Sequence, residues 1–124
     1  MTGKVLIVVD DPNFALALEL LFARHGCEVT TVHTAEEALG RMGEIRPRLL
    51  LVDGRLPFMS GFEMCQVVRA HREWHPLGAI LLTANDRQPE AAKALALGAD
   101  VCLTKPFSTR ALLDAARGLL GTTA

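Results

Sequence analysis

The chain has 124 residues, half of them apolar, and its 13 lysines and arginines against 14 aspartates and glutamates leave a formal net charge of −1. This length predicts a single domain over 1–124, and the apolar content excludes a disordered chain. The near-neutral charge argues against a nucleic-acid-binding surface, because neutralising phosphates requires a basic excess. The longest strongly apolar run, at 5–9, is too short to span a membrane.

The three cysteines, Cys27, Cys65 and Cys102, are an odd number at wide spacings, and no CxxC pair occurs. This pattern indicates neither a disulfide framework nor a zinc ribbon. The apolar run at 5–9 is followed too soon by two aspartates to be a secretory signal. We therefore expect a reduced, cytoplasmic protein that makes no membrane contact.

Short apolar runs alternate with longer helical patterns five times along the chain. Pro12 suits the first turn of a helix, and Thr34 with Glu37 three residues later predicts a capping box at the start of another. In chain order, the expected elements are a strand at 4–9, a helix at 12–25, a strand at 28–32, a helix from 34 to about 43, a strand at 48–52, a helix at 61–74, a strand at 79–82, a helix at 89–97, a strand at 101–103 and a helix from 108 to about 120.

The first, third and fourth strands are apolar without alternation, which is typical of strands that helices cover on both faces. A strand–helix unit repeated five times predicts a parallel sheet with right-handed crossovers. We therefore expect an α/β fold: a doubly wound, five-stranded parallel sheet of flavodoxin-like strand order 2-1-3-4-5.

Polar side chains stand where these strands end. Asp10 and Asp11 follow the first strand, Asp53 ends the third, Thr83 ends the fourth, and Lys105 comes just after the fifth. Ligands of open parallel sheets bind at the carboxyl edge where the strand order reverses, here between the first and third strands. The two acidic strand ends are thus expected to face each other, with the threonine and the lysine beside them.

Three carboxylates and one lysine leave a net charge of −2 at this edge. Two carboxylates ~4 Å apart repel by ~4 kcal/mol at an effective dielectric of ~20, so such a cluster takes up protons or binds a cation. Carboxylate and carbonyl oxygens suit Mg²⁺, and a carboxylate can attack phosphorus to give an acyl phosphate. Lys105 and the Thr83 hydroxyl can hold the incoming phosphoryl group. The pattern predicts Mg²⁺-dependent phosphoryl transfer onto an aspartate.

Each of these residues also has a simpler explanation. One of Asp10 and Asp11 can cap the helix that begins at Pro12, and Asp53 can belong to an ordinary turn. Thr83 can bond the backbone locally, and Lys105 can be a solvated surface lysine. Their joint occurrence at successive strand ends favours a site over four unrelated coincidences.

With these residues in place, the chain resembles the receiver domain of two-component response regulators, of the kind found in chemotaxis regulators. The segments that carry the resemblance are 5–11 (VLIVVDD), 51–57 (LVDGRLP), 60–63 (SGFE), 82–84 (LTA) and 104–107 (TKPF). They span nearly the whole chain, and as a set in this order they are highly specific.

The resemblance implies a role for each matched residue. Asp53 would be the phosphoacceptor, and Asp10, Asp11, Asp53 and the backbone carbonyl of Arg55 would hold Mg²⁺. Thr83 would bind a phosphoryl oxygen, Lys105 would pair with the phosphoryl group, and the peptide bond that follows Lys105 would be cis. A receiver also catalyses its own phosphorylation and dephosphorylation.

The resemblance also implies partners. The donor would be a sensor histidine kinase or a phosphotransfer protein, and the fourth and fifth helices would contact an output domain or a second copy. We expect either a stand-alone receiver or a piece of a longer protein.

Cys102 departs from the family pattern, which has an aromatic residue at this position three residues before the lysine. Thr83 and Cys102 would be the switch positions, and the missing ring predicts a small response on the fifth strand, with output routed through the fourth helix and the loop after Thr83. Arg55 would line the entrance to the site, where its side chain can guide a donor or hinder water. We also expect the single tryptophan, Trp74, to report metal binding by its fluorescence.

Cys102 keeps open a second function, a receiver-like protein-interaction module that does not use phosphorylation. A phosphatase of the haloacid dehalogenase type is disfavoured, because that chemistry needs an aspartate two residues after the nucleophile and position 55 is arginine. A nucleotide-binding fold is disfavoured because the chain has neither GxGxxG nor a P-loop.

Overall fold

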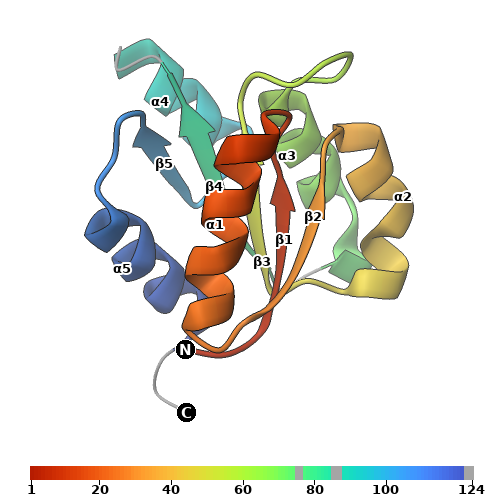
Figure 1. Ribbon diagram of the computed structural model, residues 1–124. Coiled ribbons are helices and arrows are strands. Elements are labelled where there is room, and N and C mark those ends of the chain that lie inside the picture. Colours follow the sequence, from red (N-terminus) through yellow and green to blue (C-terminus); the bar gives the residue numbers. More distant parts are fainter. Residues whose placement is uncertain (75–76, 85–87, 122–124) are drawn as a thin grey trace.

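The computed structural model describes residues 1–74, 77–84 and 88–121, which form one five-stranded sheet with helices on both sides (Figure 1). All strand pairs are parallel, and the order β2-β1-β3-β4-β5 confirms the predicted doubly wound topology. The elements are β1 (Lys4–Val8), α1 (Pro12–Arg24), β2 (Glu28–Val32), α2 (Ala35–Ile45), β3 (Leu49–Asp53), α3 (Gly61–Ala70), the 3₁₀ turn η1 (Arg72–Trp74), β4 (Gly78–Thr83), α4 (Gln88–Ala96), β5 (Val101–Thr104) and α5 (Thr109–Leu120).

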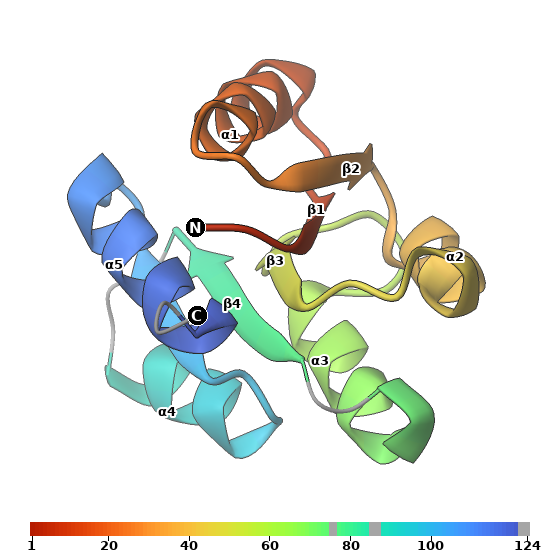
Figure 2. The same cartoon turned by 90° about the horizontal axis from the view of Figure 1, so that it is seen from below.

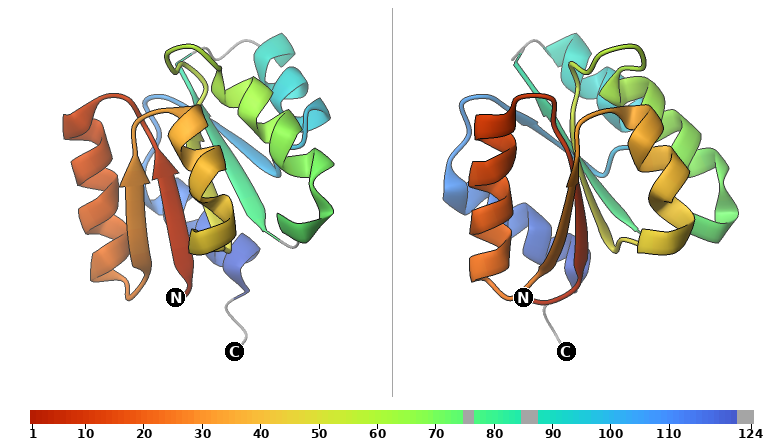
Figure 3. Two further views of the ribbon diagram at one scale, coloured as in Figure 1. Left: turned by 90° about the vertical axis from the view of Figure 1, so that its right-hand side faces the viewer. Right: turned by 45° about the vertical axis from the view of Figure 1, so that its right-hand side comes forward.

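The sheet is buried on both faces. Helices α1 and α5 cover one face, and α2, α3 and α4 cover the other (Figures 2 and 3). Successive side chains of β1 point to opposite faces of the sheet. Leu6 and Val8 pack in the core beneath α2, α3 and α4, whereas Val5 and Ile7 pack in the core beneath α1 and α5. This two-sided burial explains the unbroken apolar strands, since each buried Val or Leu side chain contributes ~1.5–3 kcal/mol.

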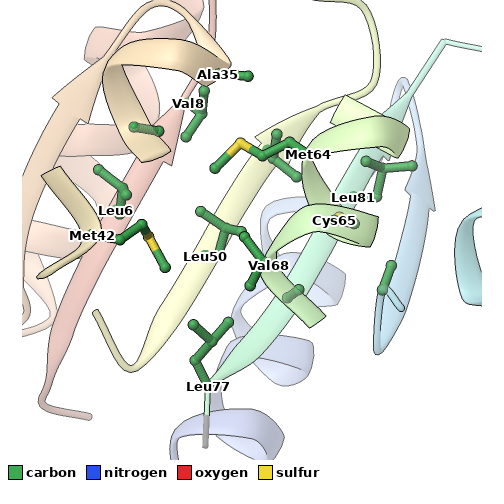
Figure 4. Close-up of a cluster of buried hydrophobic side chains, with 14 of the residues drawn as sticks. Leu6, Val8, Ala35, Met42, Leu50, Met64, Cys65, Val68, Leu77 and Leu81 are labelled. Atoms are coloured by element: carbon green, nitrogen blue, oxygen red, sulfur yellow. The ribbon is translucent and has the colours of Figure 1, made fainter. Parts of the chain in front are cut away.

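The core under α2 and α3 is built from interlocking aliphatic and sulfur-containing side chains. Figure 4 shows Met42 from α2 and Met64 and Val68 from α3 meeting leucines of the sheet. Met64 is completely buried and Met42 is 1% exposed. These contacts fix the positions of α2 and α3 against the sheet, and α3 begins close to the carboxyl end of β3.

Side-chain caps begin four of the helices. Asp11, Thr34, Ser60 and Ser108 each accept a backbone hydrogen bond at the start of α1, α2, α3 and α5 respectively, and one such cap contributes ~1 kcal/mol. The reciprocal capping box lies at Ser60, where sequence analysis placed none. At Thr34 only half of the expected box forms, because the side chain of Glu37 accepts from His33 N, 3.5 Å away and one residue before the cap.

Two helix ends differ from the expectation. Helix α2 continues past Gly43 to Ile45, because Ile45 packs in the core, and Arg46 then ends it in a left-handed conformation (φ 51°). The third helix ends at Ala70 instead of Trp74, because His71 takes extended angles and the chain re-forms as a 3₁₀ turn.

A side-chain clasp joins the ends of α3 and α4. Arg69 donates to the carbonyl oxygens of Gly98 and Leu77, at 2.7 and 2.9 Å, and pairs with the carboxylate of Asp100. Asp100 in turn accepts from Ala79 N at 2.8 Å. The clasp therefore ties the carboxyl end of α4 to the start of β4.

Within the three described ranges, no helix combines the length and the apolar character that crossing a bilayer requires.

Candidate functional site

Asp53 is the last residue of β3, and both oxygens of its carboxylate have partners. Lys105 Nζ lies 2.7 Å from Oδ2, and Arg55 N donates to Oδ1 at 3.1 Å. The Asp53 side chain is only 10% exposed and that of Lys105 31% exposed. A carboxylate so poorly solvated is stabilised by this charge-assisted contact, which is stronger than a hydrogen bond between neutral groups.

The main chain of Asp53 and Gly54 is closely packed against β4 and the start of α3. Gly54 N donates to Leu82 O at 2.7 Å, and Gly61 N donates to Gly54 O at 3.0 Å. A Cβ at Gly61 would overlap the carbonyl oxygen of Asp53 and lie 2.8 Å from its carbonyl carbon. The first residue of α3 therefore rests directly on the main chain of Asp53, and glycine is the residue that permits this approach.

Thr83 and Lys105 are joined to Asp53 through the sheet. Asp53 pairs in register with Leu82, so Thr83 stands one residue further along β4, where it is 5% exposed. Lys105 N donates to Thr83 O at 2.7 Å. The structure thus brings the three residues to one edge, and the peptide bond between Lys105 and Pro106 is cis, as the resemblance implies.

The acidic pair lies at the same edge but is not gathered into a cage. Val8 of β1 pairs with Val52 of β3, which brings the residues that follow both strands together. Asp11 Oδ1 accepts from Asn13 N at 3.0 Å and caps α1, whereas the Asp10 side chain is exposed. Among the residues that the structure describes, no three His, Cys, Asp or Glu side chains form a ready-made metal cluster.

The donor set at this edge nevertheless fits Mg²⁺. Asp10, the second oxygen of Asp11, Asp53 and the carbonyl of Arg55 are all hard oxygen donors, which is the chemistry that Mg²⁺ prefers. Because Lys105 already occupies one oxygen of Asp53 and the cap uses one of Asp11, few protein ligands remain. An ion held by so few protein oxygens keeps much of its water shell and binds weakly.

Two aromatic contacts with lysines at this edge escaped the sequence analysis. Lys105 Nζ lies 5.0 Å from the centre of the Phe14 ring, and Lys93 Nζ lies 5.0 Å from the centre of the Phe62 ring. In each contact the lysine and the ring come from different elements, so no local sequence motif marks the pair.

A cavity of roughly 370 Å³ opens beside Thr83. Its lining residues are Gly54, Arg55, Leu56, Ser60, Phe62, Thr83, Ala84 and Lys93. Arg55 is exposed and lines this cavity together with Thr83.

Cys102 lies in β5 opposite Leu81 and packs, half-exposed, against the core that contains Cys65. Burial raises the pKa of the Cys65 thiol to about 12, which keeps it protonated at neutral pH. None of the three cysteines forms a disulfide. The loop after Thr83, to which output was assigned, includes 85–87, which lie outside the described residues.

Trp74 is poorly placed for the role that sequence analysis gave it. It lines a cavity with Arg48 and Leu77, which directly precede β3 and β4, so it lies at the amino edge of the sheet. Asp53 ends β3 at the opposite edge, about 16 Å away along a five-residue strand. Trp74 therefore lies far from the predicted metal site, and its fluorescence response to metal stays a prediction.

A buried aspartate beside a lysine, at the carboxyl edge of a 2-1-3-4-5 sheet, is the arrangement of a receiver. The chain belongs to the response regulator receiver domain family, whose pattern it matches over residues 5–117. It is 36% identical over 120 residues to the phosphate regulon transcriptional regulatory protein PhoB of Rhizobium meliloti, covering 97% of this chain and 53% of that protein.

Two further curated relatives differ in length. The alkaline phosphatase synthesis transcriptional regulatory protein PhoP of Bacillus subtilis is 36% identical over 89% of this chain and 45% of its own length. Protein PilG of Pseudomonas aeruginosa is 30% identical over 90% of this chain and 83% of its own length. The chain thus spans about half the length of PhoB and PhoP and most of PilG.

Solved structures agree with this assignment. A response regulator from Chloroflexus aurantiacus superposes with a TM-score of 0.91 at 32% identity, covering 97% of this chain and 98% of that one. The beryllofluoride-activated DrrB receiver domain gives 0.85 at 30% identity, covering 97% and 98%. The Vibrio cholerae chemotaxis response regulator CheY4 gives 0.88 at 28% identity, covering 97% and 100%.

Proposed function

We propose that this chain is a phosphorylation-dependent switch that accepts a phosphoryl group on Asp53 from a sensor histidine kinase or a phosphotransfer protein, with Mg²⁺ as cofactor. The observation that carries the proposal is the 2.7 Å contact between Lys105 Nζ and the nearly buried carboxylate of Asp53. A lysine here neutralises charge on the acceptor and remains close enough to bind the phosphoryl group that arrives.

The chain's own residues provide the main steps. A carboxylate oxygen of Asp53 attacks phosphorus and forms an O–P bond while the bond from phosphorus to the donor breaks, and the leaving group takes a proton from solvent. Lys105 shifts from the carboxylate to a phosphoryl oxygen, and the Thr83 hydroxyl donates to another. Asp10, Asp11, Asp53 and the carbonyl of Arg55 would hold Mg²⁺, which would supply positive charge near the transferring group when bound.

The new charge is the signal. A phosphoryl group adds close to two negative charges at an edge where a single lysine pairs with Asp53. We propose that this charge shifts Thr83 and α4, and that the α4–α5 face contacts an output domain or a second copy. Residues 1–124 would act as one receiver domain in the cytoplasm.

The second candidate function is a protein-interaction module that does not depend on phosphorylation. Cys102 favours it, because a half-exposed thiol on β5 cannot fill the space that an aromatic ring would fill. The same fold would then present its α4–α5 face in one conformation only.

Phosphorylation by a small donor separates the two functions. The chain is incubated with acetyl phosphate and Mg²⁺ and followed by intact mass, and we expect one added phosphoryl group. Asp53→Asn and EDTA should each abolish the addition. The matched control Asp114→Asn, which changes an exposed aspartate of α5, should behave as wild type. Unmodified wild-type chain under these conditions would favour the interaction module.

A further inference from the structure

Lys105 has a second neighbour besides the acceptor. Its ammonium lies between the carboxylate of Asp53, at 2.7 Å, and the ring of Phe14, whose centre is 5.0 Å away. We propose that Phe14 is a positioning residue for phosphoryl transfer, which holds the Lys105 ammonium in the site through a cation–π contact. This inference rests on the proposed phosphorylation of Asp53.

The geometry meets the requirement for such a contact. An ammonium within about 6 Å of a ring centre is attracted by the negative face of the ring, and the attraction strengthens as the pair is desolvated. The Lys105 side chain is 31% exposed and Phe14 is half-buried. The ring therefore replaces part of the water that would otherwise surround the ammonium.

A second ring supports the first. Phe107 lies 6.1 Å from Phe14, centre to centre, with the two planes tilted by 50°. Both rings line a cavity of roughly 300 Å³ between α1 and α5. Phe107 thus supports the Phe14 ring, and Phe14 is the ring that stands beside the Lys105 ammonium.

The start of α1 places the ring. Asp11 caps the helix and Pro12 occupies its first turn, so Phe14 is the third helical residue. Each residue turns a helix by about 100°, and beginning α1 one residue earlier or later would turn the ring away from the lysine. The Asp11–Pro12 start thus fixes both the acidic pair and the ring beside the site.

The contact matters when the acceptor's charge changes. Lys105 must release the Asp53 carboxylate and take up a phosphoryl oxygen without leaving the site. A ring that attracts the ammonium in both states keeps it in place during this exchange. Loss of the ring leaves the lysine chemically intact but less well positioned, so transfer slows without being abolished.

The first test reads the contact in the unphosphorylated protein. The face of an aromatic ring shifts nearby protons upfield, so the Lys105 methylene protons next to Nζ should resonate upfield of ordinary lysines in the NMR spectrum. Phe14→Leu should return them to the ordinary position, and Phe14→Tyr should keep the shift. Phe62→Leu, which removes the ring beside Lys93, should leave the Lys105 signals unchanged.

The second test is kinetic. With acetyl phosphate and Mg²⁺, Phe14→Leu should lower the phosphorylation rate by roughly two- to tenfold, and Phe14→Tyr should restore it. Thermal unfolding of each variant shows whether it is folded at the assay temperature. If both variants are folded and the phosphorylation rate falls equally in Phe14→Leu and Phe14→Tyr, the effect reflects packing and not the cation–π contact. Such a result, or Lys105 signals that do not differ between wild type and Phe14→Leu, would overturn the inference. Failure of wild type to accept a phosphoryl group would refute the proposed function, while the NMR comparison still decides whether Phe14 holds Lys105.

Discussion

Replacing Gly61 by alanine should distort the proposed acceptor site at Asp53 through the backbone. The added Cβ would overlap the carbonyl oxygen of Asp53 and lie 2.8 Å from its carbonyl carbon and 2.9 Å from Gly54 Cα. Carbon atoms in good contact are about 3.5–4.0 Å apart, so relieving the carbon contact alone requires the strand or the helix to move by at least about 0.7 Å, and the overlap with the oxygen requires more. These neighbours are main-chain atoms within a hydrogen-bonded sheet end, so they cannot move as a flexible side chain would.

The expected loss of stability is ~1–3 kcal/mol, the usual range for inserting a methyl group into a packed site. For a chain of this length that corresponds to a fall in melting temperature of about 4–12 °C. Thermal unfolding followed by circular dichroism measures it. Because Asp53 itself must shift, the rate of phosphorylation by acetyl phosphate should fall as well, at a temperature where the variant is fully folded.

A glycine in open space provides the matched control. Gly40 lies in α2, and nothing stands within 4 Å of the Cβ that alanine would add there. Gly40→Ala should raise the melting temperature by about 2–4 °C, because alanine favours the helix by up to ~1 kcal/mol. If Gly61→Ala is as stable as Gly40→Ala, the close approach of α3 to the acceptor is wrong.

Three further predictions follow from the packing and the charges. Burial raises the pKa of Cys65 in the folded state to about 12, above the value of 9.0 for an unperturbed thiol. The stability that the protonated thiol contributes is therefore complete below pH 9 and is lost as the pH rises toward 12. The free energy of unfolding, measured in urea, should fall less steeply over this pH range in Cys65→Ala than in wild type. Amide NMR with beryllofluoride should show small changes on β5 in wild type and larger ones in Cys102→Tyr, whereas wild-type changes at Cys102 as large as those at Thr83 would contradict the account. Arg69→Ala removes the donor to two backbone carbonyls and the ion-pair partner of Asp100, which keeps its hydrogen bond from Ala79 N. It should lower the free energy of unfolding by ~2–4 kcal/mol in urea, and a loss below ~0.5 kcal/mol would show that the clasp is not needed.

The sheet and the position of the site could be predicted from sequence because both depend on regular patterns. A strand buried on both faces must be apolar throughout, as Leu49–Val52 is, so its first polar residue marks the carboxyl edge. Parallel strands end on the same side, so Asp53, Thr83 and Lys105 had to meet there. No detail of side-chain packing is needed for this inference.

The remaining details depend on competition between local interactions. Asp11 can cap a helix or bind a metal, and in the structure its Oδ1 caps α1. The position of the Phe14 ring over Lys105 depends on where α1 starts, which helical periodicity does not determine. Trp74 was placed in a helix, and the extended angles of His71 end that helix four residues earlier. The competing local conformations differ in free energy by about 1 kcal/mol, and the pattern of polar and apolar residues does not show which of them is the more stable.

The most direct test of the central claim is to locate the phosphoryl group chemically. Borohydride reduces an aspartyl phosphate to homoserine, so the chain is treated with acetyl phosphate and Mg²⁺, reduced, digested and mapped by mass spectrometry. The account predicts homoserine at position 53 alone, with none when EDTA is present. Homoserine at Asp10 or Asp11, or at no position in a wild-type chain that remains folded, would contradict it.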